Sequence, residues 1–217
     1  MVDARELLEE LDSVVVLTGA GISTDSGVPD YRGPNSIRAT PMMYQEFVGD
    51  VENQRRYWAR NYQGWAHLFR ADPNAGHLAL ARWESTGLPV RLAGLVTQNV
   101  DGLHEAAGQQ RLVTLHGRSA DVVCLGCGQL TRRDDLQVRL AELNPYIAPR
   151  PEMGHAELRP DADVEVTDWH DFRLAACLSC GGVLKPDVVF FGETVPPARV
   201  QQSVAWCDEA DALLVAG

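Results

Sequence analysis

Four of the five cysteines in this 217-residue chain come as two Cys-x-x-Cys pairs, Cys124 with Cys127 and Cys177 with Cys180. Glycines flank both pairs, as the turns of zinc knuckles require. Four thiolates fill the tetrahedral shell of Zn²⁺ and leave no open position, so the pattern predicts one structural Zn²⁺ per chain rather than a catalytic metal. The alternative, a redox dithiol, is disfavoured because neither pair stands at the start of an expected helix.

The two pairs lie far apart in the sequence. Residues 128 to 176, 49 positions in all, separate them, whereas compact zinc ribbons use about 15–20. We therefore expect a segment around 144–171 to loop out between the knuckles. The fifth cysteine, Cys207, has apolar neighbours and is expected to be a small buried residue rather than a reactive thiol.

Polar side chains follow the apolar run 92–97. Gln98, Asn99 and Asp101 carry amide and carboxylate groups suited to ribose hydroxyls and to a carboxamide. In open α/β sheets, ligands bind at the carboxyl ends of the strands. We therefore predict a ligand site at the end of this run.

A histidine closes the next apolar run, 112–115. An imidazole at the end of a strand can act as a general base near neutral pH, and His116 has this position. A single histidine is more often structural, but two neighbouring strand ends rich in polar groups favour the catalytic interpretation. His77 and His104 are expected to be structural.

A glycine-bearing turn follows the apolar run 13–18 directly. Gly19 allows a tight turn, and Gly21 lets the backbone approach a pyrophosphate. Thr24 stands where the third glycine of the dinucleotide fingerprint would be, and no acidic residue follows at the spacing that would bind ribose. These departures argue against an NAD-linked oxidoreductase. The turn alone leaves nucleotide binding and an ordinary strand-to-helix connection equally open.

The continuation of this turn shifts the balance towards nucleotide binding. A helix cannot pass through Gly27-Val28-Pro29, so an irregular loop carries Asp30, Tyr31 and Arg32 near the phosphate turn. A guanidinium at that position can make two parallel hydrogen bonds to a phosphate. A solvated surface loop does not explain why these three side chains come together.

The elements that position these residues alternate between strands and helices. Apolar runs at 13–18, 92–97, 112–115, 188–191 and 212–216 are expected to be strands, and helical spacing occurs at 41–65 and 74–84, where Asn74 is a plausible N-cap. The pattern predicts an α/β fold with a Rossmann-like, mostly parallel sheet. We assign residues 1–118 and 186–217 to this sheet domain, with 34–75 as the helical part of a small domain, and 119–185 to an inserted zinc-binding module.

The overall composition narrows the class of function. A formal net charge of −11 disfavours nucleic-acid binding, because an acidic surface repels phosphate backbones. The sequence shows no transmembrane run and no targeting signal, so we expect a cytoplasmic protein without membrane partners.

The order of these motifs resembles that of the sirtuins, from about residue 13 to the end of the chain. The shared motifs are GAGIS from Gly19, GVPDYRG from Gly27, PNAGH from Pro73, TQNVDGLH from Thr97, Leu115-His116-Gly117, the two cysteine pairs, and LKPDVVFFGE from Leu184. The long spacing between the cysteine pairs, Tyr57-Trp58-Ala59-Arg60-Asn61 and Gly64-Trp65 look like the class II branch.

The resemblance implies an NAD⁺-dependent protein-lysine deacylase, acting as a deacetylase or on acidic acyl groups. The carbonyl oxygen of an acyl-lysine would attack the ribose as nicotinamide leaves, giving free lysine and O-acyl-ADP-ribose. His116 would be the general base, Asn99 would also be catalytic, and Val189, Phe190, Gly192 and Glu193 would pair with the peptide as an added strand. NAD⁺ would be bound by Gly19, Ala20, Gly21, Thr24, Asp30, Tyr31, Arg32, Gln98, Asn99, Val100, Asp101 and Gly217.

The resemblance also has a departure. Sirtuins continue past this point with a strand and a Gly-Ser/Thr-Ser turn, whereas the chain stops at Gly217. On this basis we expect a C-terminally truncated sirtuin. The alternatives are a catalytically impaired fragment that binds only zinc and peptide, and a protein mono-ADP-ribosyltransferase.

The acyl preference has one candidate determinant. Tyr57 and Arg60 are three positions apart on an expected helix and so share a face. In sirtuins that prefer acidic acyl groups, a Tyr-x-x-Arg pair binds the distal carboxylate. An equally weighted alternative is that Tyr57 packs in the small domain and Arg60 is solvated.

Overall fold

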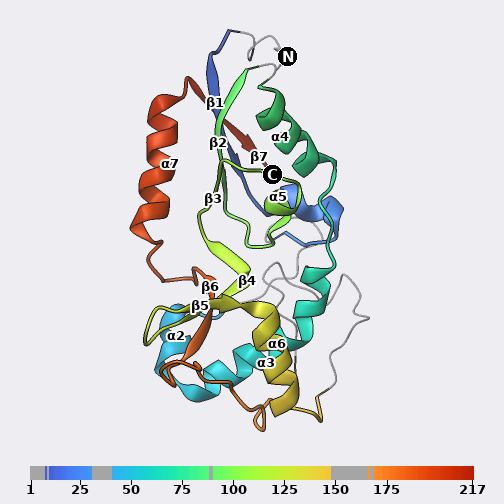
Figure 1. Cartoon of the computed structure of the whole chain (residues 1–217), viewed down its shortest axis with the longest axis vertical. Coiled ribbons are helices and arrows are strands. Elements are labelled where there is room, and N and C mark those ends of the chain that lie inside the picture. The colour runs from blue at the N-terminus through green and yellow to red at the C-terminus, as the bar shows by residue number, and fades with distance from the viewer. Residues whose placement is uncertain (1–7, 9, 31–40, 88–89, 148–165, 167–168) are drawn as a thin grey trace.

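The computed structural model describes the chain except for residues 1–7, 9, 31–40, 88–89, 148–165 and 167–168. The described elements form a parallel sheet with its helices at one end of the molecule and a small antiparallel sheet with its helices at the other (Figure 1). This arrangement confirms the predicted fold class, an α/β sheet domain with a small cysteine-bearing module.

The parallel sheet has four strands in the order β3-β2-β1-β7. They are β1 (Ser13–Thr18), β2 (Arg91–Thr97), β3 (Leu112–Thr114) and β7 (Ala212–Ala216), and all neighbouring pairs are parallel. Four of the five strands expected from apolar runs are therefore in this sheet. Because all its strands run the same way, their carboxyl ends meet at one edge.

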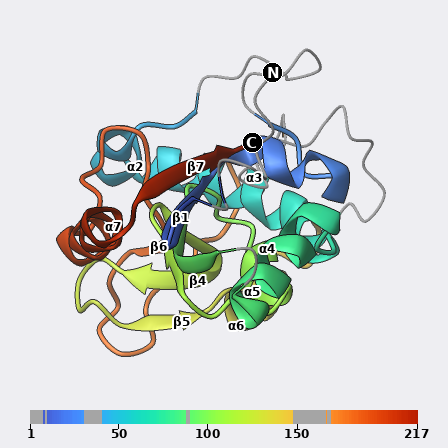
Figure 2. The same cartoon turned by 90° about the horizontal axis from the view of Figure 1, so that it is seen from above.

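Helices cover both faces of the parallel sheet (Figure 2). Val14 and Val16 of β1 pack with Leu80 of helix α4 (Ala75–Thr86), whereas Val15 packs in the cluster that includes Trp206 of helix α7 (Pro197–Glu209). Successive side chains of a strand point to opposite faces of the sheet, so these three adjacent valines pack towards two helices on opposite faces. The side chain of Asn74 accepts hydrogen bonds from the N–H groups of residues 76 and 77 and caps α4, as predicted.

The expectation that Cys207 is buried was wrong, because α7 turns this residue away from the sheet. Trp206 lies against Gly94 of β2 so closely that a Cβ on Gly94 would be 2.2 Å from the indole ring. The next helical position then points away from the sheet. Cys207 is exposed, although its sequence neighbours are apolar.

The small sheet has three antiparallel strands in the order β5-β4-β6. They are β4 (Gly117–Cys124), β5 (Leu130–Arg132) and β6 (Leu184–Val188). The expectation of a strand at 188–191 in the parallel sheet was wrong: β6 ends at Val188 and pairs with β4. Its sequence, LKPDV, contains a proline and two charged residues, and its pairing depends on a segment 60 or more positions away.

Three helices surround the small sheet: α2 (Tyr44–Gly49), α3 (Val51–Phe69) and α6 (Arg133–Leu143). Helix α6 occupies part of the sequence between the cysteine pairs, and the centre of the predicted loop, 148–165, lies outside the described residues. Arg133 of α6 is fully buried, with its guanidinium 5.2 Å from the Trp58 ring and 4.9 Å from the Trp65 ring of α3. It also donates two hydrogen bonds to Asn61 Oδ1, so one cation holds α6 against α3.

Two short helices complete the described chain: the 3₁₀ helix η1 (Ala20–Ser26) and α5 (Leu103–Ala106). Gly27 ends η1 with a left-handed φ of 82°. Among the described residues, no helix is both long and apolar enough to cross a membrane.

Candidate functional site

The four paired cysteines come together at one end of the small sheet. The sulfur atoms of Cys124, Cys127, Cys177 and Cys180 all lie within 4.8 Å of one another. The Cys124–Cys180 and Cys127–Cys177 separations are 3.5 and 3.8 Å. A tetrahedral Zn²⁺ with Zn–S distances of about 2.3 Å requires sulfur atoms about 3.8 Å apart. The residues present therefore fit a four-coordinate structural zinc.

The backbone around the cluster also suits thiolates. Gly126 N–H donates to Cys124 Sγ and Gly182 N–H donates to Cys180 Sγ, each at 3.4 Å. The backbone N–H of Cys127 lowers the pKa of the Cys124 thiol to about 6. A Cβ on Gly182 would be 2.9 Å from Cys124 Sγ, so the turn has no room for a side chain.

The glycine turn lies where β1 ends. Gly19 is the N-cap of η1, and Thr24 Oγ1 donates to the Gly21 carbonyl at 3.0 Å. Gly217, at the end of β7, packs against this turn: a Cβ on Gly21 would lie 2.8 Å from the Gly217 carbonyl carbon. The absence of side chains at Gly19 and Gly21 thus allows the turn to approach the backbone of Gly217 closely. The sequence did not reveal this requirement. Asp30 is described, whereas Tyr31 and Arg32 lie outside the described residues.

A polar network joins the glycine turn to the end of β2. Asn99 Nδ2 donates to the Gly19 carbonyl at 2.9 Å and to Ser23 Oγ at 3.1 Å. Ser23, which is fully buried, donates to Asp101 Oδ2 at 2.7 Å. Asp101 Oδ1 accepts from the N–H of Leu103 at 3.0 Å. Sequence reasoning did not single out Ser23, although it lies within the GAGIS motif.

Two buried histidines lie beneath this network. The rings of His77 and His104 are 4.8 Å apart, edge to face. Burial, followed by the nearby His77, lowers the pKa of His104 to about 3, and burial lowers the pKa of His77 against the raising effect of Asp101. Burial therefore favours the neutral form of both rings. His77 Nε2 is 3.4 Å from Ser23 Oγ, so this ring supports the residue that orients Asp101.

His116 follows β3 at the same edge of the sheet. Its Nδ1 is 3.0 Å from the carbonyl oxygen of Gln98. A carbonyl only accepts, so Nδ1 carries the proton and Nε2 of the neutral ring is left as a base. The hydrogen bond places the base candidate beside Gln98, whose own N–H donates to the Thr18 carbonyl. Val100 lies two residues after Gln98, and its carbonyl accepts a hydrogen bond from the N–H of Ser119.

The predicted peptide-binding segment begins where β6 ends. Val189 N–H donates to the His116 carbonyl at 2.8 Å. The ring of Phe190 is buried against Phe47 and Tyr57, with centroid distances of 5.3 and 5.0 Å. Gly192 has a left-handed φ of 79°. The segment therefore contacts the base candidate on one side and, on the other, the core cluster that contains Phe47 and Tyr57.

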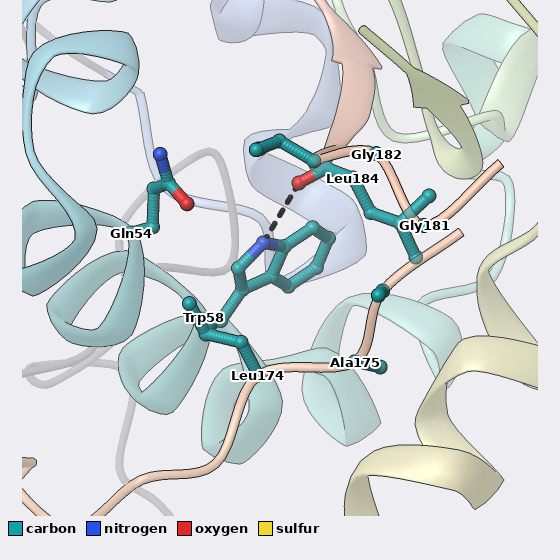
Figure 3. A pocket seen from close by; sticks show the side chains of 9 residues that line it. Gln54, Trp58, Leu174, Ala175, Gly181, Gly182 and Leu184 are labelled. Carbon is teal, nitrogen blue, oxygen red and sulfur yellow. Dashed lines mark hydrogen bonds between the residues drawn. The ribbon is translucent and has the colours of Figure 1, made fainter. Parts of the chain in front are cut away.

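Tyr57 and Arg60 both lie on α3. Tyr57 is 7% exposed and packs edge to face against Phe47. Arg60 is partly buried one turn further along the helix. A separate shallow pocket lies between α3 and the second cysteine knuckle, where Trp58 Nε1 donates to the Leu184 carbonyl at 3.0 Å (Figure 3).

The comparisons with known proteins decide the family. A sequence profile of the Sir2 family matches residues 19–217. The chain belongs to the Sir2 family. The protein called NAD-dependent protein deacetylase 1 in Mycobacterium avium is 50% identical over 205 residues, which cover 94% of this chain and 72% of that protein. Its namesake in Streptomyces coelicolor is 51% identical over 208 residues, covering 94% and 67%.

Solved Sir2 structures share the fold of this Sir2 chain. A mutant Sir2 homologue in complex with ADP-ribose aligns with a TM-score of 0.71 at 29% identity, covering 100% of this chain and 74% of that one. A complex of Sir2 with a p53 peptide and NAD⁺ aligns with a TM-score of 0.70 at 28% identity, covering 98% and 73%.

Proposed function

We propose that this Sir2 chain is an NAD⁺-dependent protein-lysine deacetylase, or more broadly a deacylase, that releases nicotinamide and transfers the acyl group to ADP-ribose. The observation that carries the proposal is the meeting of a basic His116 Nε2 and the Asn99–Ser23–Asp101 network at one edge of the sheet. A general base next to amide and carboxylate groups suits a ribose and a carboxamide.

The residues at this edge have distinct roles in binding. NAD⁺ supplies an electrophilic ribose carbon whose nicotinamide can leave. Asn99 Nδ2 is held by Gly19 and Ser23, so Asn99 Oδ1 can accept from the carboxamide, and Asp101 lies beside it. The glycine turn of Gly19, Ala20 and Gly21 suits the pyrophosphate. Further contacts with NAD⁺ are assigned to Thr24, Asp30, Tyr31, Arg32, Gln98, Val100 and Gly217.

His116 moves the proton. Its Nε2 accepts a proton from a ribose hydroxyl while Nδ1–H remains bonded to the Gln98 carbonyl, which stabilises the resulting imidazolium. The backbone of Val189 is bonded to His116, and the segment Val189, Phe190, Gly192 and Glu193 holds the acyl-lysine peptide next to this base. Two related structures are complexes, one with a p53 peptide and NAD⁺ and one with a propionylated peptide. The thiolate cluster needs reduced cysteines, which supports a cytoplasmic location.

Mass spectrometry of an acetyl-lysine peptide incubated with the protein tests the proposal. We expect loss of the acetyl group only when NAD⁺ is present, together with release of nicotinamide. A gain of ADP-ribose on the peptide would instead show a mono-ADP-ribosyltransferase. Absence of both reactions, with no calorimetric heat on adding NAD⁺, would show a protein that binds zinc and peptide without turnover.

Replacing Arg60 with methionine is expected to reduce the preference for glutaryl-lysine over acetyl-lysine. A desolvated guanidinium–carboxylate contact contributes about 1.5–3 kcal/mol, so the ratio of kcat/KM values should fall by about tenfold or more. The measurement compares both peptides with wild type and variant. Arg55→Met is the control, because Arg55 lies on the same helix in a partly exposed pair with Glu52. An unchanged ratio would place Arg60 on the surface and leave Tyr57 as a packing residue.

A further inference from the structure

Lys185 is the only lysine in a chain that has 18 arginines. It lies on β6 and is 3% exposed. Burial lowers the pKa of this ammonium against the raising effect of Glu193, and an unpaired charge in this position would be costly. A buried lysine in a chain so rich in arginine indicates a local requirement for the ammonium group.

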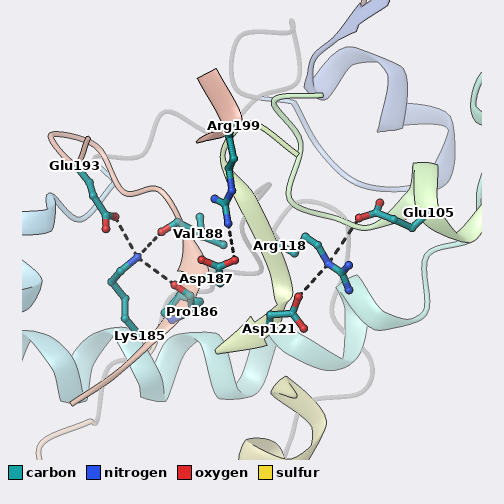
Figure 4. Close-up of polar contacts among 9 residues, drawn as sticks. All are labelled: Glu105, Arg118, Asp121, Lys185, Pro186, Asp187, Val188, Glu193 and Arg199. Carbon is teal, nitrogen blue, oxygen red and sulfur yellow. Dashed lines mark hydrogen bonds and ion pairs between the residues drawn. The ribbon is translucent and has the colours of Figure 1, made fainter. Parts of the chain in front are cut away.

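The ammonium has three protons and three acceptors (Figure 4). Lys185 Nζ donates to the carbonyl oxygens of Pro186 at 3.1 Å and Val188 at 2.5 Å, and to Glu193 Oε2 at 3.1 Å. A lysine ammonium offers three rotatable donors and accepts nothing, so this set satisfies it fully. A guanidinium is a planar fork and cannot direct its donors at three acceptors around one nitrogen.

The carboxylate partner closes the turn that follows β6. Glu193 Oε2 also accepts from the Phe190 N–H at 2.8 Å, and the Glu193 N–H donates to the Phe190 carbonyl at 3.0 Å. The ammonium lies 4.8 Å from the centre of the Phe190 ring. Both backbone groups of Phe190 are thus occupied within the turn. Phe191 is itself bridged to Met43, and the Val189 N–H donates to the His116 carbonyl, so the Val189 carbonyl and the Gly192 backbone are left for peptide pairing.

The same turn is attached to the general base candidate. Val189 N–H donates to the His116 carbonyl, and Val188 pairs with Gly117. Gly117 has a φ of 84°, and a Cβ there would be 1.8 Å from the Asp187 carbonyl oxygen. The start of β4 and the end of β6 therefore meet with no room for a side chain between them. The shape of the turn therefore sets where a peptide lies relative to His116.

We propose that the buried Lys185 and the partly buried Glu193 form an ion pair that positions residues 189–192 to receive the acyl-lysine peptide. The pair acts through the turn and touches no reacting atom, so both are positioning residues. This role rests on the proposed deacylase function, and it revises the prediction for two residues. The Glu193 carboxylate points to Lys185 rather than to substrate, and Phe190, whose backbone groups are both bonded to Glu193, shapes the turn rather than pairing with peptide.

Steady-state kinetics with the peptide and NAD⁺ varied separately tests the role. Lys185→Met should raise the peptide KM by about tenfold or more, the effect of losing a hydrogen bond to a charged group, and leave the NAD⁺ KM within about twofold. Lys185→Arg keeps the charge but should behave like Lys185→Met. Glu193→Gln should raise the peptide KM less. Adding Glu193→Gln to Lys185→Met should lower it again, because it removes the unpaired carboxylate.

Arg55→Met, which breaks a partly exposed ion pair on α3, is the control for losing a cation, and both of its KM values should match those of wild type. Zinc content and thermal unfolding identify any variant that fails to fold, and Glu193→Gln then carries the test. A peptide KM that stays at the wild-type value, or a NAD⁺ KM that rises equally, overturns the positioning role. A wild-type protein that deacylates no peptide overturns the proposed function, and the positioning role with it.

A measurement without turnover completes the test. Protein labelled with ¹⁵N in lysine alone contains one side-chain ammonium, that of Lys185. We expect one slowly exchanging signal that shifts on adding acyl-lysine peptide and broadens in Glu193→Gln. A rapidly exchanging signal, typical of an exposed lysine and unaffected by Glu193→Gln, would contradict both the burial of Lys185 and its pairing with Glu193.

Discussion

Replacing His116 with asparagine is expected to slow lysine deacylation by a factor of about 10² to 10⁴, the range for loss of a general base. An asparagine amide can still donate to the Gln98 carbonyl, which His116 Nδ1 contacts at 3.0 Å. It has no nitrogen with a basic lone pair at the position of Nε2. The change therefore removes proton transfer and keeps the backbone arrangement, in which the His116 carbonyl accepts from Val189.

Single-turnover and steady-state rates on an acetyl-lysine peptide measure this effect. Zinc content and NAD⁺ binding by calorimetry should match the unmodified protein, because the His116 ring bonds to the Gln98 carbonyl and not to the cysteine cluster or the Asn99 network of the described chain. His170→Asn is the matched control: His170 is 70% exposed and lies near Glu52 on the small domain. Turnover of His116→Asn at the wild-type rate would remove His116 from the chemistry.

The parallel sheet could be predicted from the sequence because each of its strands is marked by a short, continuous apolar run. The run SVVVLT of β1 is buried on both faces and forms a continuous apolar segment. The site at its edge follows from the same logic, since strand ends of a parallel sheet meet. Strand order along the chain therefore suffices to predict that Gln98, Asn99, Asp101 and His116 share one edge.

The small sheet could not be predicted in the same way. Strand β6 contains a proline and two charged residues, and its pairing with β4 depends on a segment far away in the sequence. Lys185 and Arg133 would both be assigned to the surface from residue type, yet both are buried. Their burial depends on partners, Glu193 for one and Asn61 with two indole rings for the other. Such partners become visible only in three dimensions.

Replacing Cys180 with alanine is expected to abolish stoichiometric zinc binding and to unfold the small antiparallel sheet at ordinary temperature. Structural zinc sites contribute about 10–16 kcal/mol of apparent binding free energy in zinc-finger peptides, and binding is coupled to folding. In this chain the cluster joins the end of β4 to β6, where Cys124 pairs with Leu184. Cys124 and Cys177 also belong to the core cluster that contains Phe47 and Tyr57.

Metal analysis of freshly purified, reduced protein, together with thermal unfolding, measures this effect. Cys207→Ala is the matched control: Cys207 is exposed on α7, outside the cluster, so this variant should keep one Zn²⁺ and the wild-type unfolding temperature. A chelator should reproduce the Cys180→Ala phenotype in the unmodified protein, and added Zn²⁺ should reverse it. Because β6 leads directly into the turn at 189–193, deacylation should fall together with zinc content. Unmodified protein that is fully folded without stoichiometric zinc would contradict the assignment of the cluster.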